Sequence, residues 1–175
     1  MAKKFAKESF TVMNELVLPN DTNTLNNLMG GKLLLWMDIC SAMAAQKHSN
    51  SIVVTVSVDN VSFQRSVKLG EVISIEAQVT RSFNSSMEVR MTVYAQNLPE
   101  GTKIKTNEAY YTFVAIDSEG RPRAVPETVP ETQKEMILFN GALQRRELRL
   151  ILSGKMKPQD ATELQNILTT FGIKN

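Results

Sequence analysis

The stretch that decides the fold reads GGKLLLWMDICSAMAAQK and covers residues 30–47. It has no proline, and no glycine after its first two positions, so it predicts one long helix from Lys32 to Lys47. A helix that is apolar on nearly every side must be buried on more than one face. A sheet wrapped around it, with a second subunit over what remains, meets that requirement. The apolar positions are Leu33, Leu34, Leu35, Trp36, Met37, Ile39, Cys40, Ala42 and Met43.

Strand patterns lie on both sides of this helix. Two segments alternate apolar and polar side chains with a period of two, and the polar residues 82–86 between them suit a hairpin turn. Other segments are rich in β-branched and aromatic residues. Short connections make the sheet of about five strands largely antiparallel. The expected strands are residues 10–18, 52–63, 73–80, 87–96 and 109–116.

The end of the chain differs in character. Pro122, Pro126 and Pro130 predict a stiff extended connector. A helix is expected from Glu131 to Ser153 and a shorter one from Lys157 to Phe171. We therefore expect an α+β domain over residues 1–130 and a helical C-terminal extension over residues 131–175.

Composition excludes several classes of protein. A net charge of +2 does not favour nucleic acid, and no stretch approaches the roughly 20 apolar residues that insert into a membrane. The N-terminus is not a secretory signal. One cysteine, Cys40, and one histidine, His48, allow no disulfide and no metal site. A cytoplasmic protein without a metal is the natural expectation.

Asp38 is the most informative residue, because its apolar neighbours predict a buried position. Burying an ionised carboxylate without partners costs several kcal/mol. Asp38 is therefore either satisfied structurally, at the rim of the helix, or required for chemistry.

A polar, Asn-rich loop over residues 18–29 leads to Gly30 and Gly31 at the helix start. Free N–H groups there, with no Cβ to block approach, form a natural site for a negatively charged oxygen. The alternative is ordinary capping, with glycine serving close packing against a strand.

The sequence resembles the hot-dog acyl-CoA thioesterases of the bacterial and brain cytosolic acyl-CoA hydrolase type. The similar segments run in the family's order from Thr11 to Arg146. They are residues 19–38, 53–59, Phe63, 68–71, 85–89, 111–115 and 126–132.

This resemblance implies a hot-dog fold, in which a five-stranded antiparallel sheet wraps around the central helix. It implies a homo-oligomer, usually a hexamer built as a trimer of hot-dog dimers. The activity it implies is hydrolysis of fatty acyl-CoA to free fatty acid and CoA, within fatty acid metabolism and with no cofactor. Asp38 matches the family's catalytic carboxylate. Asn23 matches an asparagine of the same site, which is built across a subunit interface, and the matched glycines lie beside the thioester.

On this basis Asp38 is expected to act as a general base on water or as a direct nucleophile, with Asn23 holding the water or the thioester. Gly30 and Gly31 are expected to stabilise the oxyanion. Thr55, which lies on a strand near the family's site, and Ser85 and Ser86, at the hairpin, are further candidates for substrate binding. The serines suit plain turn chemistry equally well. The acyl chain is expected along the helix wall that includes Leu34 and Trp36.

Two alternatives remain open. Hot-dog dehydratases or hydratases generally rely on a histidine, and His48 is poorly placed to serve. A non-catalytic acyl-CoA-binding regulator would keep the pocket and lose the carboxylate.

Cys40 and His48 lie more than two helical turns apart and cannot meet. We interpret Cys40 as a thiol of the core. We interpret His48 as a histidine at the helix end, a position that the C-terminal dipole of the helix makes favourable.

Overall fold

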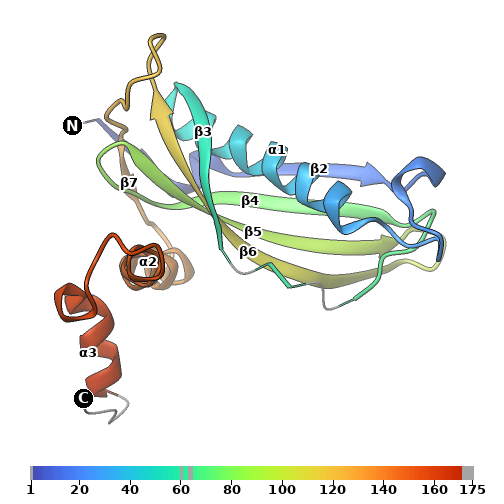
Figure 1. Cartoon of the computed structure of the whole chain (residues 1–175). Coiled ribbons are helices and arrows are strands. Elements are labelled where there is room, and N and C mark those ends of the chain that lie inside the picture. Colours follow the sequence, from blue (N-terminus) through green and yellow to red (C-terminus); the bar gives the residue numbers. More distant parts are fainter. Residues whose placement is uncertain (1, 60, 63–64, 171–175) are drawn as a thin grey trace. The chain divides into compact units, whose positions relative to one another are not determined.

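The structure is a computed structural model that describes residues 2–59, 61–62 and 65–170, with the side chains of 167–170 left out (Figure 1). The chain divides into two compact units, Met1–Val129 and Pro130–Asn175. The first unit carries the candidate site.

The first unit is built on one antiparallel sheet with the strand order β2-β4-β5-β6-β3. Its long helix α1, Gly30–Ser49, lies across the curled sheet (Figure 1). The expected hot-dog arrangement is thereby confirmed. The strands are β2 Thr11–Leu16, β3 Ile52–Asp59, β4 Val72–Ser82, β5 Ser86–Asn97 and β6 Thr102–Ile116.

The core lies between α1 and the face of the sheet that it covers. Alternate residues of β4, β5 and β6 point to this inner face and are almost fully buried, as the period of two predicts. From α1, Met37, Cys40 and Ala44 are fully buried against them. The inner-face residues are Ile73, Ile75, Ala77, Val79, Met87, Val89, Met91, Val93, Ala109, Tyr111, Phe113 and Ala115.

One apolar stripe of α1 stays uncovered in the single chain. Leu35, Ile39 and Met43 follow one another at a spacing of four residues and are 51%, 42% and 37% exposed. The edge strand β3 also exposes Ile52, Val54, Val56 and Val58. The sequence predicts that a second subunit covers apolar side chains that the sheet leaves exposed, and these are such side chains.

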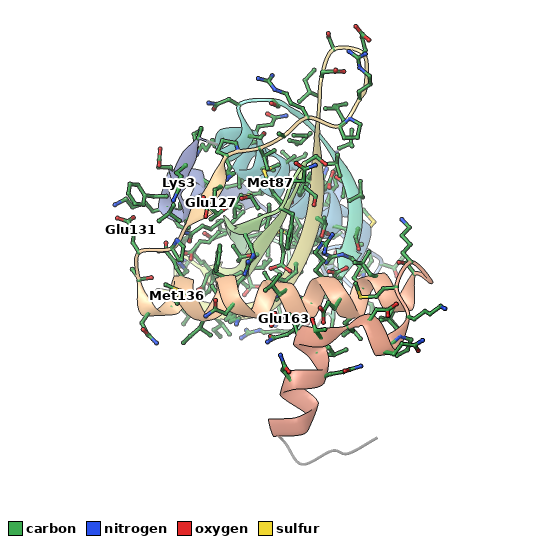
Figure 2. All side chains as sticks on the ribbon, turned by 90° about the vertical axis from the view of Figure 1, so that its left-hand side faces the viewer. Lys3, Met87, Glu127, Glu131, Met136 and Glu163 are labelled. Atoms are coloured by element: carbon green, nitrogen blue, oxygen red, sulfur yellow. The ribbon has the colours of Figure 1, made fainter. Side chains whose placement is uncertain are left out.

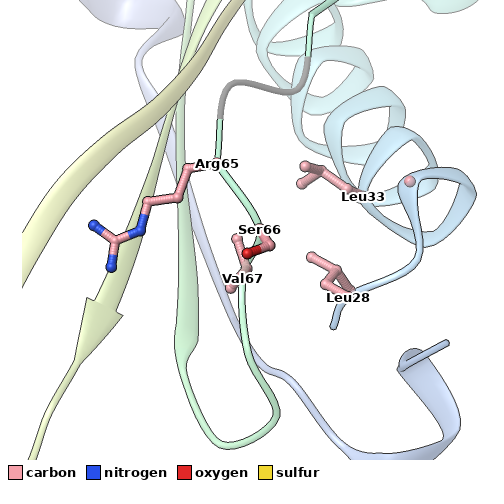
Figure 3. Close-up of a pocket in the computed structure, with 6 residues that line it drawn as sticks. Leu28, Leu33, Arg65, Ser66 and Val67 are labelled. Atoms are coloured by element: carbon pink, nitrogen blue, oxygen red, sulfur yellow. The ribbon is translucent and has the colours of Figure 1, made fainter. Parts of the chain in front are cut away.

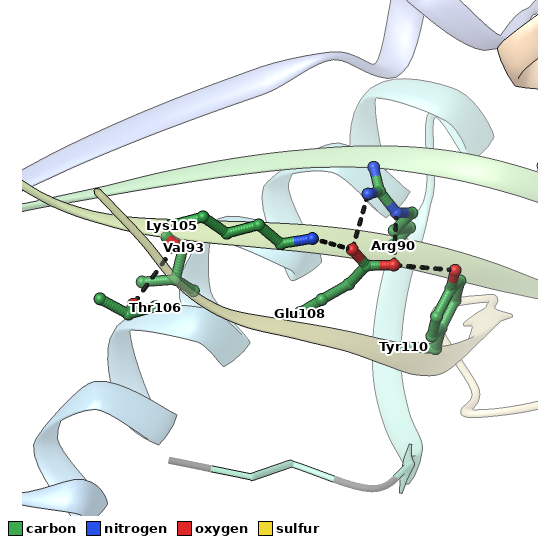
Figure 4. A network of polar contacts seen from close by, with 6 residues as sticks. All are labelled: Arg90, Val93, Lys105, Thr106, Glu108 and Tyr110. Carbon is green, nitrogen blue, oxygen red and sulfur yellow. Dashed lines mark hydrogen bonds and ion pairs between the residues drawn. The ribbon is translucent and has the colours of Figure 1, made fainter. Parts of the chain in front are cut away.

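The outer face of the sheet is polar (Figure 4). Arg90 donates two hydrogen bonds to Glu108, at 3.0 and 2.8 Å, and Lys105 and Tyr110 donate to the same carboxylate. The hydrogen bonds from Arg90 chiefly lower the pKa of Glu108 to about 2. This network ties β5 to β6 on the side away from α1.

Several boundaries differ from the prediction. β6 begins at Thr102 because residues 102–107, although polar, pair with β5. β3 ends at Asp59, and Phe63 lies outside the described residues. Within the predicted extended connector, β7, Glu127–Val129, forms a strand that the sequence did not predict and pairs in parallel with β1, Lys3–Phe5. Figure 2 shows Lys3 beside Glu127, with a 3.5 Å ion pair between them.

The second unit is helical. Its helix α2, Gln133–Leu152, begins with a capping box in which Thr132 accepts a hydrogen bond from the backbone of Glu135. After Gly154 and a short 3₁₀ turn, Pro158–Asp160, comes α3, Thr162–Thr170. Glu147 accepts hydrogen bonds from the first-turn backbone of α3, at 3.3 and 2.8 Å. The predicted helix end, Phe171, lies outside the described residues.

Candidate active site

The centre of the candidate site is a hydrogen bond between α1 and the edge strand β3. The Thr55 hydroxyl donates to Asp38 Oδ1 at 2.7 Å. Asp38 is half-buried rather than buried as predicted, because α1 turns this position toward the sheet edge and not toward the core. A half-buried carboxylate with one oxygen held by a donor keeps a fixed orientation.

The other oxygen of Asp38, Oδ2, accepts no hydrogen bond within the part of the chain that the structure describes. It is therefore available to a substrate or to water. From the sequence, Thr55 was a candidate for substrate binding only because it lies on a strand near the family's site. The structure makes it the residue that orients the carboxylate, across seventeen positions of sequence.

The start of α1 presents unsatisfied donors. The first backbone N–H groups that the helix itself pairs are those of Lys32 and Leu33, which both donate to the carbonyl of Met29. The glycines at the two preceding positions are already helical, so the predicted start at Lys32 is two residues late. A Cβ on Gly31 would meet nothing within 4 Å, so the packing explanation for this glycine is wrong. Gly31 leaves its N–H open to approach.

The loop before α1 is fixed by Asp21, which sequence reasoning passed over. Asp21 is buried, accepts from the backbone of Leu18 at 3.1 Å and pairs with Lys32 at 3.0 Å. The hydrogen bond from Lys32 holds the pKa of Asp21 below its usual value. The cluster Asp21-Thr22-Asn23 was the available signal, because an Asp near a helix start commonly caps the loop.

Asn23 is exposed in this loop. Its side-chain oxygen accepts from the backbone of Leu25 and of Asn27, at 2.9 and 3.2 Å, which folds the loop as an Asx turn. Among the described residues no hydrogen bond joins Asn23 to Asp38. Within the described chain the side-chain oxygen of Asn23 is occupied by its own loop and Oδ1 of Asp38 by Thr55.

A hollow of about 310 Å³ lies beside the helix start (Figure 3). Its apolar walls are formed by Leu28, Leu33 and Val67. The other residues that line it are Gly30, Arg65 and Ser66. Figure 3 shows the Arg65 side chain directed away from the two leucines. The hollow thus joins an apolar surface to the donor end of α1.

The remaining candidates are placed differently. Ser85 and Ser86 are half-buried at the β4–β5 hairpin, where their carbonyl groups accept from the backbone of Ala115 and Phe83. Ser86 precedes Met87, an inner-face residue, so its side chain lies on the opposite face from Thr55. Trp36 is only 6% exposed within the core and is not an open wall for an acyl chain.

His48 and Cys40 are both buried. Burial raises the pKa of the Cys40 thiol to about 11, and its interpretation as a core thiol is confirmed. His48 Nε2 lies 3.0 Å from the carbonyl oxygen of Pro126 and 3.2 Å from the Thr128 hydroxyl, while its Nδ1 has no partner. Burial lowers the pKa of His48, so its interpretation as a cation that stabilises the helix end is wrong.

Two further findings concern the described residues alone. Nowhere among them do three His, Cys, Asp or Glu side chains gather in a way that would hold a metal ion. Within the same residues, every helix is too short or too polar to cross a membrane.

The model of the thioesterase superfamily matches residues 25–102. An uncharacterized acyl-CoA thioester hydrolase of Bacillus subtilis, YkhA, is 37% identical over 167 residues, which are 95% of this chain and 94% of that protein. Acyl-coenzyme A thioesterase 11 of Mus musculus is 34% identical over 83% of this chain, which spans only 24% of the mouse protein.

Solved structures are similar in fold as well as sequence. An apo-hexameric acyl-CoA thioesterase has a TM-score of 0.85 and 38% identity over 87% of this chain and 98% of its own. The acyl-CoA hydrolase of Staphylococcus aureus, solved with butyryl coenzyme A and coenzyme A, has a TM-score of 0.80 and 34% identity over 87% of this chain and 95% of its own.

The staphylococcal protein has also been solved with single alanine substitutions of an asparagine, an aspartate and a threonine. In that order along the chain, the three are separated by 15 and then 17 positions. Asn23, Asp38 and Thr55 have the same residue types and the same two intervals.

Proposed function

The chain belongs to the thioesterase superfamily, and on that premise we propose that it hydrolyses fatty acyl-CoA to free fatty acid and CoA. The observation that carries the proposal is the Asp38 carboxylate, held at the sheet edge by Thr55 with its second oxygen open. The matching order and spacing of Asn23, Asp38 and Thr55 in the staphylococcal hydrolase support it.

In the proposed reaction Asp38 Oδ2 accepts a proton from a water molecule, whose oxygen attacks the thioester carbon. The carbon–sulfur bond then breaks, and the CoA thiolate leaves and takes up a proton. Direct attack by Asp38, with an anhydride that water opens later, gives the same products. Neither route requires a metal or an organic cofactor.

The backbone N–H groups of Gly30 and Gly31, on the copy of the chain that supplies Asn23, are the proposed donors to the carbonyl oxygen, because about 10 Å of helix separates Gly31 from Asp38 of the same chain. They stand at the positive end of a helix of 20 residues, where negative charge is stabilised. The apolar hollow beside them, with Leu28 and Leu33, suits the first part of an acyl chain. Losing one such donor typically lowers the rate by about 100- to 1,000-fold.

We propose that Asn23 acts in the site of a second copy of the chain. Within the described residues no hydrogen bond joins it to Asp38, and the apolar stripe of α1 together with the edge of β3 leaves a surface for a second copy. Hot-dog dimers assembled three at a time would form a hexamer, and a hexameric neighbour of 38% identity supports that state. Ser85 and Ser86, whose side chains make no hydrogen bond in the described chain, remain proposed contacts for CoA.

We also propose that the protein works in the cytoplasm, in fatty acid metabolism. Its single cysteine is a buried, unmodified thiol, which is compatible with a reducing compartment. Acyl-CoA substrates carry the fatty acids of that compartment's metabolism.

The two rival functions are less well supported. A dehydratase or hydratase would require a histidine at the site, and His48 is enclosed by Pro126 and Thr128. A non-catalytic acyl-CoA-binding regulator would not need an oriented carboxylate. Release of free thiol from acyl-CoA, followed with a thiol-reactive dye, supports the hydrolase, whereas tight binding without release supports the regulator.

The decisive test is Asp38→Asn. We expect kcat to fall by at least about 100-fold, because the base is removed, while binding of CoA and the oligomeric mass stay unchanged. Asp59→Asn is the matched control, since Asp59 lies on β3 and accepts from the Ser57 hydroxyl at 2.6 Å. Near-normal hydrolysis by Asp38→Asn would refute the assignment.

A further inference from the structure

Tyr111 is a buried phenol on the inner face of β6. It is 1% exposed, among the largest enclosed side chains. Within the described residues its hydroxyl makes no hydrogen bond, although a buried tyrosine hydroxyl normally finds a partner. A hydroxyl without a partner in the described chain is available to a group that arrives from outside the chain.

The register of the strands places Tyr111 next to the candidate site. Phe113, two residues further along β6, pairs with Thr55, the donor to Asp38. Tyr111 pairs with Val58 on the same edge strand and shares the inner face with Phe113 and Thr55. The register therefore puts Tyr111 on the same face of the sheet as Thr55, which holds Asp38, and two residues along β6 from the partner of Thr55.

We propose that Tyr111 is a further catalytic residue, whose hydroxyl donates a hydrogen bond to the thioester carbonyl oxygen as that oxygen becomes negative. The inference rests on the proposed hydrolase function and names a donor beyond the start of α1. During attack the proton moves to Asp38 and the negative charge moves from that carboxylate to the carbonyl oxygen. A donor close to both positions stabilises the charge where it arrives. The phenol keeps its own proton throughout.

The electrostatics of the phenol agree with this role. Burial, and after it the negative charge of Asp38, raise the pKa of Tyr111 to about 12. The hydroxyl therefore stays protonated at every pH at which an enzyme of this kind is assayed. The negative charge of Asp38 acts on Tyr111 although no hydrogen bond joins the two side chains within the described residues.

The first test is Tyr111→Phe, which removes one oxygen and keeps the ring that packs in the core. We expect kcat to fall by about 100- to 1,000-fold with KM for the acyl-CoA changed by no more than about twofold, because the lost bond forms in the transition state. Tyr110→Phe is the matched control, because Tyr110 is the adjacent residue, lies on the outer face and donates to Glu108. It should leave kcat unchanged.

The outcomes separate this inference from the proposed function. If the unaltered protein releases no thiol, both are overturned. If it hydrolyses acyl-CoA and Tyr111→Phe does so at the same kcat, or differs only in KM, the inference alone is overturned.

A second measurement keeps the hydroxyl in place. The chain has three tyrosines, so Tyr94→Phe with Tyr110→Phe leaves Tyr111 as the only position for 2,3-difluorotyrosine. Fluorination lowers the pKa of the phenol, and a phenolate cannot donate. We expect the fluorinated protein to lose kcat at a high pH at which the unfluorinated protein keeps it. An unchanged pH profile would show that the phenol is only structural.

Discussion

Thr55 shows how much depends on a single hydroxyl. Its Oγ1 lies 2.7 Å from Asp38 Oδ1, and the rest of the threonine stands on an exposed edge strand. A hydrogen bond to a charged group contributes about 1.5–3 kcal/mol. Here that free energy keeps the carboxylate in one orientation instead of spreading it over several rotamers.

We therefore expect Thr55→Val to lower kcat by about 10- to 100-fold at little cost in stability, because it keeps the shape and removes the donor. Thr55→Ser, which retains the hydroxyl, should keep most of the activity. Steady-state kinetics with thermal unfolding of both variants checks this. Equal activity of the valine and serine variants would contradict the role given to the hydroxyl.

His48 makes the first unit sensitive to acid. Its buried Nδ1 has no acceptor, so the folded state resists protonation and the pKa lies below the ordinary 6.5. The unfolded chain takes up the proton at that ordinary value. The free energy of unfolding should therefore be fully retained above about pH 6.5 and fall as the pH drops below it.

This dependence is measured by urea unfolding between pH 5 and pH 8. The variant His48→Gln cannot take up the proton and should show a flatter profile across the same range. A second loss, from the Glu108 carboxylate, is expected only below the ordinary value of 4.5 and down to about 2. A His48→Gln profile as steep as that of the unaltered protein would contradict this account.

At the scale of elements, α1 serves two purposes. Its inner side supplies Met37, Cys40 and Ala44 to the core, and its first turn presents unpaired N–H groups beside an apolar hollow. Glycine weakens a helix by about 1 kcal/mol relative to alanine. No atom of the first unit lies close to the position of a Cβ on Gly31, so close packing does not explain why a glycine stands there and weakens the helix.

We expect Gly31→Ala to leave the free energy of unfolding unchanged or to raise it by up to about 1 kcal/mol, while hydrolysis falls because a methyl group stands beside the N–H. Gln46→Ala, on the exposed end of the same helix, controls for the gain in helix propensity and should remain fully active. Thermal unfolding and thiol release are measured on both. Full activity of Gly31→Ala would argue against substrate approach at this turn.

At the scale of the whole molecule, we propose that a second copy of the chain completes the site. Asp38 stands at the edge of the sheet, Asn23 stays in its own loop, and the exposed stripe of Leu35, Ile39 and Met43 runs along the same helix. A two-fold dimer that covers the stripe would present the loop of one copy to the carboxylate of the other. A symmetric dimer would then hold two such sites.

Complementation tests this arrangement. Asp38→Asn and Asn23→Ala should each be nearly inactive alone, whereas co-expressed chains should regain about a quarter of the unaltered activity, since half the dimers are mixed and each mixed dimer has one intact site. Native mass measurement confirms the mixed species. Mixed dimers without activity would mean that each chain builds its own site.

Much of this architecture could be predicted from local pattern. The alternation in β4 and β5 and the unbroken apolar stretch of α1 are written in neighbouring residues, because a strand and a helix bury side chains at fixed periods. The same reasoning predicted that the apolar side chains of α1 need a second covering surface besides the sheet. It failed at residues 102–107, whose polar character conceals a strand, and at Glu127–Val129, whose partner lies at the opposite end of the first unit.

By itself the sequence determined the helix, the succession of most strands along the chain and the choice of Asp38 as the candidate catalytic residue. Each of these depends on residues that are neighbours along the chain. Only the tertiary structure decided that Thr55 orients that carboxylate, that Tyr111 shares the inner face with Thr55 and that the Asn23 oxygen bonds to its own loop. The physical reason is the short range of a hydrogen bond. Whether two groups meet within about 3 Å is set by strand register and helix orientation, which no local pattern specifies.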